Sequence, residues 1–245
     1  MNGEEKFIFD LEGYLVVKNA LSEEEVAALN DVSDEKFPYG DKTATGEWTL
    51  LRWGQLFKKL IDHGNILPYL LELLGPRVRL DHDYCIFMNQ GERRGGLHGG
   101  FGGDHWYRYR NGEMRNGLTV VTYFLTDAPA GAGGFACVPG SHKSYFSPGD
   151  IPDEVRSFER AAHYVTQPAV EAGDALIFTE ALIHGTMEWR ADHERRALLY
   201  KYSPGHSSWA LNWYDLDQVG ELTEQQKRIL APPSVQDHQA VIAEG

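Results

Sequence analysis

The order of helical and β-like patterns along the chain constrains its fold more than any other feature. Ser22 and Glu25 have the spacing of a capping box, so residues 22–37 are predicted to form a helix. Helical spacing continues through 54–61 and 65–75, and short β-rich runs separated by Gly, Pro, Asp and Asn follow. Helices followed by many short strands are typical of a β sandwich or jelly roll with helices packed outside it. We therefore expect a mainly β fold, a double-stranded β-helix (jelly roll) with flanking α-helices, formed by residues 1–245 as a single domain.

The expected strands cover most of the middle of the chain. Residues 7–19 are interpreted as an early strand with a turn at Gly13. The tail from residue 220 is expected to begin as a helix and to lose its pattern after Pro232 and Pro233. The other expected strands are 77–88, 118–125, 135–138, 163–170, 175–178 and 197–202.

The charge of the chain excludes several classes of partner. A formal net charge of −13 opposes broad contact with nucleic acid polymers or anionic membranes, because such contacts rely on clustered Lys and Arg. A local arginine pocket for one small anion is compatible with this charge. Only Cys85 and Cys137 are present, so no disulfide framework is indicated. The amino-terminal residues lack a long apolar run, and we expect a cytoplasmic protein.

Two of the ten histidines stand in segments that favour metal binding. His98 follows a strand-like run and lies in the glycine-rich stretch 95-GGLHGGFGGDH-105, where the backbone can approach a bound group closely. His184 ends a turn, a buried strand and a short loop, 173-GDALIFTEALIHGT-186. Arg195 follows eleven residues later, at the start of another strand. A jelly roll can place these two strands side by side, with a guanidinium beside a metal-bound histidine. Such an arginine suits a bidentate contact with a carboxylate.

The chain resembles the phytanoyl-CoA dioxygenase-like family of iron(II)/2-oxoglutarate oxygenases. The resemblance rests on GYLVVKNALSEEEVAAL near the start, GGFACVPGSHK at 133–143, and GDALIFTEALIHGT with Arg195 behind it. It implies that His98 and His184 bind Fe(II) and that O2 and 2-oxoglutarate are cosubstrates. It also implies that Arg195 holds the distal carboxylate of 2-oxoglutarate, with a hydrogen bond from Thr186. Arg196 is the rival for this contact, since adjacent strand residues face opposite ways.

One position departs from the family pattern. The family has Asp two residues after the first histidine, and this chain has Gly100. In this respect it is similar to the C–H halogenases, whose iron has His-x-Gly or His-x-Ala. Loss of the carboxylate frees a metal position for chloride, which carries the same charge. This resemblance implies a halogenase that chlorinates an unactivated C–H bond of a free-standing small molecule.

Three alternatives stay open. Asp104 or His105 could supply the third ligand, which would give a hydroxylase. Water could occupy the position left by the missing carboxylate, in an enzyme that hydroxylates or rearranges its substrate. The metal site could also be degenerate, leaving a noncatalytic ligand-binding jelly roll.

Several other polar residues are given structural interpretations. His142, in the PGSH segment, is expected to stabilise a turn. His82 and Asp83 are expected to face opposite sides of one strand. Glu180 is interpreted as a solvated loop carboxylate near His184, and Cys137 as a small core residue.

The substrate is the feature that the sequence determines least. Five arginines surround the glycine-rich loop and are interpreted either as solvated charges or as a local anion site: Arg93, Arg94, Arg108, Arg110 and Arg115. Trp106, Tyr107 and Tyr109 could offer a flat face for a heteroaromatic ring. A nucleotide is the leading candidate, and the sequence leaves the oligomeric state open.

Overall fold

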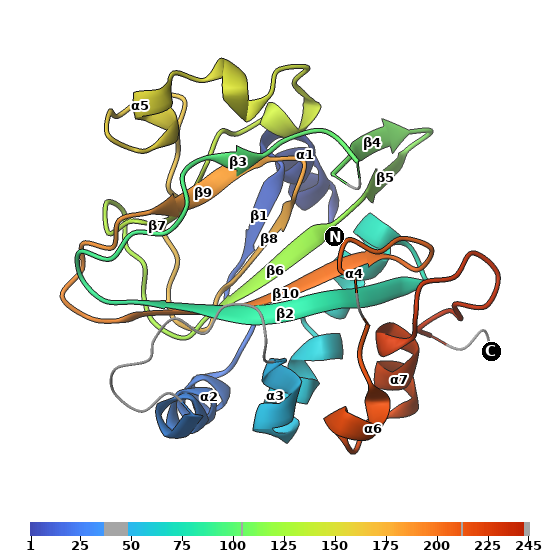
Figure 1. The fold of residues 1–245 in the computed structure, drawn as a ribbon. Helices are drawn as coiled ribbons and strands as arrows, with labels where there is room; N and C mark the ends of the chain where they lie inside the picture. Colours follow the sequence, from blue (N-terminus) through green and yellow to red (C-terminus); the bar gives the residue numbers. More distant parts are fainter. Residues whose placement is uncertain (37–48, 104, 212, 243–245) are drawn as a thin grey trace.

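The computed structural model describes residues 1–36, 49–103, 105–211 and 213–242, and its centre is formed by two antiparallel β-sheets (Figure 1). The larger sheet has the strand order β1 (Tyr14–Val17), β8 (Ala175–Thr179), β6 (Thr119–Phe124), β10 (Arg195–Pro204) and β2 (Val78–Met88). The smaller sheet has the order β3 (His98–Gly99), β9 (Ile183–Met187) and β7 (Gly134–Cys137). A separate hairpin is formed by β4 (Tyr107–Arg110) and β5 (Glu113–Asn116). The predicted jelly roll with flanking helices is confirmed.

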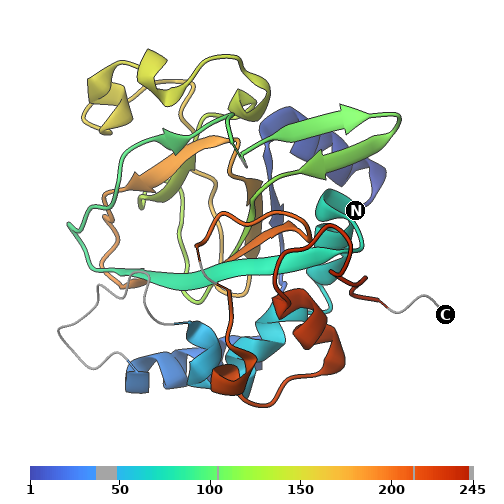
Figure 2. The ribbon, with the colours of Figure 1, turned by 45° about the vertical axis from the view of Figure 1, so that its right-hand side comes forward.

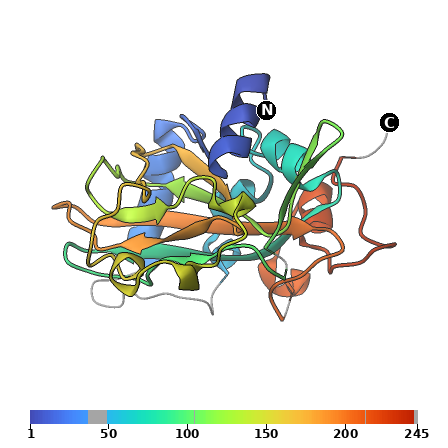
Figure 3. The same ribbon diagram turned by 90° about the horizontal axis from the view of Figure 1, so that it is seen from above.

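Most helices cover the face of the larger sheet that points away from the smaller one. In Figure 1, α2 (Glu23–Lys36), α3 (Gln55–Lys59), α6 (Leu216–Val219) and α7 (Glu224–Leu230) lie below the larger sheet. The smaller sheet and α5 (Asp153–Arg156) lie above it, and Figure 3 shows both sheets from that side. The remaining helices are α1 (Gly3–Glu12) and α4 (Leu67–Leu74), with 3-10 turns η1 (Leu50–Trp53), η2 (Leu60–Asp62), η3 (Ser141–Lys143) and η4 (Pro148–Asp150).

Strand β10 separates two hydrophobic cores. Its residues Leu198, Tyr200 and Tyr202 belong to the core beneath the helices. Ala197 and Leu199 point the other way, into the layer between the two sheets. Because strand side chains alternate, Arg195 and Lys201 emerge on this second face as well. The layer between the sheets therefore receives two cations, one near each end of β10.

The amino-terminal strand prediction was wrong for residues 7–12. Residues 3–12 form helix α1, because Asn2 and Glu5 make a reciprocal capping box at its start. Gly13 ends the helix in the left-handed conformation, with φ of 83°, and the strand begins only at Tyr14. A side chain at position 13 would place its Cβ 2.5 Å from Nδ1 of His142.

Of the other predicted elements, the three helices are present and one strand is absent. The helices predicted at 22–37, 54–61 and 65–75 are present as α2, α3 with η2, and α4, although residue 37 lies outside the described residues. The strand predicted at 163–170 is not formed, and only isolated bridges join Thr166 to Cys137 and Val170 to Ala128. The tail contains α7 and no helix or strand after Pro232 within its described part. No helix among the described residues is long and apolar enough to cross a membrane.

Candidate active site

His98 and His184 lie directly opposite each other on neighbouring strands of the smaller sheet. They form a register pair between β3 and β9, and their ring centroids are 4.5 Å apart. His184 is buried against Phe178 and Phe135, whereas His98 is exposed. The two candidate metal ligands predicted from sequence are thus brought together by strand pairing.

Both imidazoles are oriented by a backbone carbonyl. Nδ1 of His98 is 2.7 Å from the Gly96 oxygen, and Nδ1 of His184 is 2.8 Å from the Leu182 oxygen. Because a carbonyl can only accept, each Nδ1 donates, and Nε2 of the neutral ring keeps its lone pair for a metal. Burial lowers the pKa of His184 to about 4, so this ring is neutral near pH 7.

Glu180 is the carboxylate next to these histidines. It lies in the turn between β8 and β9, and it is buried, with only 3% of its surface exposed. Oε1 accepts from Nζ of Lys201 at 2.6 Å, and Oε2 lies 3.8 Å from Nε2 of His184. Burial alone opposes ionisation, but the neighbouring His184 and Lys201 hold the pKa of Glu180 below its usual range. The interpretation of Glu180 as a solvated carboxylate was therefore wrong.

Arg195 crosses the layer between the sheets and ends beside β7. It is buried, with 2% exposure, and its guanidinium carbon is 5.9 Å from the centroid of the Phe124 ring. Nη1 donates to the Ile86 oxygen at 3.4 Å, but Nε has no hydrogen-bond partner among the described residues. Gly134 makes room for this side chain, since a Cβ there would lie 2.7 Å from Nε of Arg195. Burial lowers the pKa of Arg195 to about 10, which leaves it cationic at neutral pH.

Arg196 has a different environment from its neighbour. It forms ion pairs with Asp34 (2.5 Å) and Glu194 (2.7 Å) on the side of helix α2. Arg195 is therefore the one of the two that points between the sheets. Thr186 is two residues after His184 on β9, so its side chain leaves the strand on the same face as that histidine.

The backbone at Gly100 does not direct a side chain toward the histidines. Its φ is +87°, a conformation that strains residues with a Cβ. A Cβ at this position would lie 3.1 Å from Cδ of Pro148 and 3.6 Å from Cγ1 of Ile183. Ile183 packs with Leu97 and Val155 on the face of β9 opposite to His184. A side chain at position 100 would therefore start beside Pro148 and Ile183, on the face of β9 opposite to His184.

Asp104 and His105 are the two residues that the sequence suggested as alternative third ligands. Asp104 lies outside the described residues. His105 is half-buried, and its Nε2 has no hydrogen-bond partner among the described residues. Within the described part of the chain, no three His, Cys, Asp or Glu side chains already form a group that could hold a metal ion. His98 and His184 could supply two ligands, and a third would require movement of Glu180 or His105, or a residue outside the described set.

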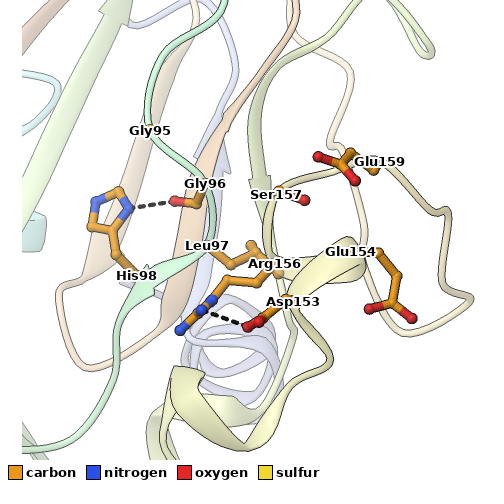
Figure 4. Close-up of a pocket in the computed structure, with 9 residues that line it drawn as sticks. All are labelled: Gly95, Gly96, Leu97, His98, Asp153, Glu154, Arg156, Ser157 and Glu159. Atoms are coloured by element: carbon orange, nitrogen blue, oxygen red, sulfur yellow. Dashed lines mark hydrogen bonds and ion pairs between the residues drawn. The ribbon is translucent and has the colours of Figure 1, made fainter.

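A pocket of about 830 Å³ borders His98 on the side of α5 (Figure 4). Its lining includes Asp153, Glu154 and Glu159, and Asp153 pairs with Arg156 at 2.6 Å. The His98 ring points away from Glu154 and Glu159 in this view. Neither Glu180 nor Lys201 is among the residues that line this acidic pocket.

The other polar residues considered in the sequence make packing and hydrogen-bond contacts away from the two site histidines or within the core. His142 lies in the η3 turn, where Nε2 is 3.1 Å from the Asp10 oxygen and the ring packs edge-on against Tyr107. Cys137 is buried opposite His184 on β7. His82 stacks on Tyr84 and Trp209, while the carboxylate of Asp83 accepts from Tyr214 and Leu50.

Sequence reasoning missed Lys201, which holds Glu180 in place. The available signal was its position on β10, six residues after Arg195 and on the same face of the strand. Its Nζ also lies 5.4 Å from the centroid of the Tyr84 ring.

Comparison with solved structures gives the same overall fold. HygX from Streptomyces hygroscopicus, in a structure with nickel and 2-oxoglutarate bound, is 21% identical, with a TM-score of 0.74 over 98% of both chains. The 2-oxoglutarate-dependent carbocyclase SnoK from nogalamycin biosynthesis is 17% identical, with a TM-score of 0.63 over 84% of this chain and 85% of SnoK. The epimerase SnoN from the same biosynthesis is 15% identical, with a TM-score of 0.63 over 96% of this chain and 95% of SnoN.

Comparison with sequences identifies the family. A search of curated proteins finds no match. The family model for phytanoyl-CoA dioxygenase (PhyH) matches residues 9–197, which include β1, both site histidines and Arg195. The chain therefore belongs to the phytanoyl-CoA dioxygenase family, whose fold it shares with iron- and 2-oxoglutarate-binding enzymes.

Proposed function

We propose that the protein is an iron(II)- and 2-oxoglutarate-dependent oxygenase that hydroxylates a C–H bond of a small polar molecule. The observation that carries this proposal is the pair His98 and His184, whose Nδ1 atoms face backbone carbonyls and whose Nε2 atoms keep their lone pairs. The buried guanidinium of Arg195, with Nε unpartnered among the described residues, fits the distal carboxylate of 2-oxoglutarate. When bound, iron(II) with 2-oxoglutarate and O2 supplies the oxidising chemistry and yields succinate and CO2.

The residues of the chain then have separate roles. His98 and His184 hold the metal, and Arg195 orients 2-oxoglutarate through its distal carboxylate. Thr186 donates a hydrogen bond to the same carboxylate from the face of β9 that carries His184. The buried phenyl rings around His184 exclude water from one side of the metal site.

Glu180 is proposed as the carboxylate ligand that completes the site. Two ligand atoms at about 2.1 Å from one metal are about 3.0 Å apart at adjacent octahedral positions and about 4.2 Å apart at opposite ones. The 3.8 Å between Oε2 of Glu180 and Nε2 of His184 is close to these separations, so a small movement of the carboxylate would let both atoms contact one metal ion. Lys201 binds the other oxygen, so Oε2 can turn toward the metal while Oε1 keeps its ion pair. Two imidazoles and one carboxylate form the ligand set of many non-heme iron oxygenases.

Halogenation is the second candidate, and Gly100 is the observation that favours it. With no carboxylate two residues after His98, chloride could take a metal position and the product would carry chlorine. The direction of the Cβ at position 100 and the nearby Glu180 favour hydroxylation instead, because the negative charge is already present. A hydroxylase with Asp104 as the third ligand stays a prediction, as does the noncatalytic ligand-binding jelly roll.

A small polar molecule is proposed as the substrate by analogy with a protein of the same fold. One structure of HygX contains hygromycin B together with nickel and 2-oxoglutarate, so a protein of this fold accepts a polar small molecule. A nucleotide substrate stays a prediction.

A metabolite screen tests the proposed activity. The protein is supplied with iron(II), 2-oxoglutarate and O2, and each candidate is scored by succinate formation and by the mass of its product. Parallel reactions in chloride and bromide buffers separate the two candidates, since a hydroxylated product has the same mass in both. Products that carry chlorine or bromine would identify a halogenase. If candidate compounds bind but none of them leads to conversion of 2-oxoglutarate to succinate, the protein is a noncatalytic ligand-binding jelly roll.

A further inference from the structure

A second pocket, of about 320 Å³, lies where the β4–β5 hairpin meets the turn between α4 and β2 and the loop after β10. Figure 2 shows the hairpin on the same side of the molecule as the carboxy-terminal segment. The polar residues that line this pocket come from separate segments of the chain: Arg77, Trp106, Arg108, Arg115, Asn116, His206 and Ser234. Three guanidinium groups therefore border one small pocket.

The charge of this lining is opposite to that of the whole chain. The chain has 36 acidic and 23 basic residues, yet neither Asp nor Glu lines this pocket. The pocket beside His98 is lined by three acidic residues, and a third pocket, around His82, also has three: Asp81, Asp83 and Asp215. The arginine-lined pocket is thus a local positive region in an acidic protein, as an anion site requires.

Backbone carbonyls orient two of the guanidinium groups, those of Arg77 and Arg115. Nη1 of Arg115 donates to the Glu72 and Met114 oxygens at 2.9 and 2.8 Å, and Nη1 of Arg77 donates to the Val235 oxygen at 3.3 Å. A carbonyl acceptor orients a guanidinium without cancelling its charge. The carboxylate of Glu113 is 3.6 Å from Arg115 and largely exposed. Arg108 forms no ion pair within the described part of the chain.

Asn116 is also part of the lining, at the end of β5, and its side chain is buried. Its register partner is Tyr107, whereas Arg115 lies opposite Arg108, so the Asn116 side chain leaves the hairpin on the other face from these two arginines. The charged donors that the pocket offers to an anion are therefore the three arginines.

We propose that this pocket binds a phosphate group carried on a small molecule. A planar carboxylate is satisfied by one bidentate arginine, whereas a tetrahedral phosphate offers three terminal oxygens to donors from different directions. Arg77, Arg108 and Arg115 belong to three segments, which matches the second geometry. Trp106 adds a flat apolar wall for the part of the molecule that carries the phosphate.

This assignment revises the arginine cluster expected from sequence. Arg108 and Arg115 belong to the pocket and Arg77 joins them, whereas Arg93 pairs with Glu188 at 2.6 Å and does not line the pocket. The inference does not depend on the iron or on 2-oxoglutarate. Its test is therefore a binding measurement on the metal-free protein of residues 1–245.

The experiment measures binding of inorganic phosphate, glycerol phosphate and phenyl phosphate by calorimetry at low ionic strength, with acetate and benzoate as carboxylate probes. We expect the phosphates to bind more tightly than the carboxylates. Arg77→Gln and Arg108→Gln should each weaken phosphate binding roughly 10- to 100-fold, since each removes a charged donor. Arg110→Gln is the matched control, because Arg110 lies on the same strand outside the pocket lining and should bind phosphate as the wild type does.

Each contrary result has a definite meaning. Absence of phosphate binding to the wild type, or equal affinity for the carboxylates, would overturn the proposal. Equal weakening in Arg110→Gln would show attraction to general surface charge. Loss in Arg195→Gln, with Arg108→Gln unaffected, would place phosphate in the cosubstrate site instead. Arg77 and Arg108 are both exposed, so we expect both variants to fold as the wild type does.

Discussion

Oε2 of Glu180 lies 3.8 Å from Nε2 of His184, while Oε1 of the same carboxylate is bound by Lys201 at 2.6 Å. One oxygen is therefore held by a partly buried cation, and the other faces the imidazole nitrogen that is available to a metal. This arrangement offers a carboxylate to the site from a different part of the chain than the glycine-rich loop.

Replacing Glu180 by Gln should weaken divalent metal binding by on the order of 100-fold, because the neutral amide is a poorer ligand than a carboxylate. Metal affinity is measured by calorimetry with Co(II) or Ni(II) under anaerobic conditions. Glu188→Gln is the matched control, since Glu188 pairs with Arg93 outside the site. Wild-type affinity in Glu180→Gln would show that Glu180 is not a ligand.

The two neighbouring arginines should differ sharply in their effect on 2-oxoglutarate. Arg195→Ala should cost on the order of 2–5 kcal/mol of 2-oxoglutarate binding free energy, because a buried charged contact is lost. Arg196→Ala should leave this affinity unchanged, because its ion pairs lie on the helix side of the sheet. The dissociation constant is measured on the metal-loaded protein. The reverse ranking of the two variants would contradict the assigned role of Arg195.

Gly134→Ala offers a way to displace Arg195 without removing it. The new Cβ would lie 2.7 Å from Nε of Arg195, on a backbone with φ of +78°. We expect weaker 2-oxoglutarate binding and a less stable fold, by about 1–3 kcal/mol. Gly131→Ala is the control, because it has a similar φ of +84° with nothing within 4 Å of its Cβ. If both variants bound 2-oxoglutarate equally well, the close contact at Gly134 would have no role in placing the guanidinium.

Gly100→Asp should not restore a metal ligand. Its φ of +87° and the contact with Pro148 predict destabilisation of about 1–3 kcal/mol, and the side chain would start on the face of Ile183. Metal affinity, measured beside a Gly95→Asp control with open space at its Cβ, should not rise. A clear gain in affinity, with loss of halide from the product, would support the halogenase candidate instead.

The buried His142 should make stability fall on acidification. Burial lowers its pKa to about 4, against about 6.5 in the unfolded chain, although the nearby Asp10 acts in the opposite direction to burial and Lys143. Below pH 6.5 the unfolded chain takes up the proton first, so the free energy of unfolding decreases down to about pH 4, by about 3 kcal/mol at most. Denaturant unfolding of wild type and His142→Gln at several pH values checks this. Parallel curves for the two proteins would contradict it.

The parts of the site that sequence could predict are those carried by local motifs. His184 ends a turn–strand–loop segment and Arg195 begins the next strand, and the roles proposed for them rest on the family resemblance that these segments carry. Glu180 could not be assigned in this way, because its burial depends on Lys201, a residue 21 positions away. Gly100 departs from the pattern of the family in sequence, but the direction of a Cβ added there depends on backbone angles that the sequence does not specify.

Some elements of the fold could also be predicted from sequence, and others could not. The helix at residues 3–12 was missed because Phe7, Ile8 and Phe9 have β propensity, whereas the capping box of Asn2 and Glu5 determines the local structure. Phe7 is 65% exposed, so its apolar character does not indicate a buried strand. The long central strands were predicted because their apolar residues pack on two cores, which requires near-continuous hydrophobic runs.

The central claim is that His98 and His184 hold iron(II) beside 2-oxoglutarate. Its most direct test is a visible absorption band. Metal-to-ligand charge transfer gives this band when iron(II) and 2-oxoglutarate are added anaerobically and 2-oxoglutarate chelates the iron. We predict this band for the wild type and its loss in both His98→Ala and His184→Ala, with the fold retained by circular dichroism. A band of full intensity in either variant would contradict the claim.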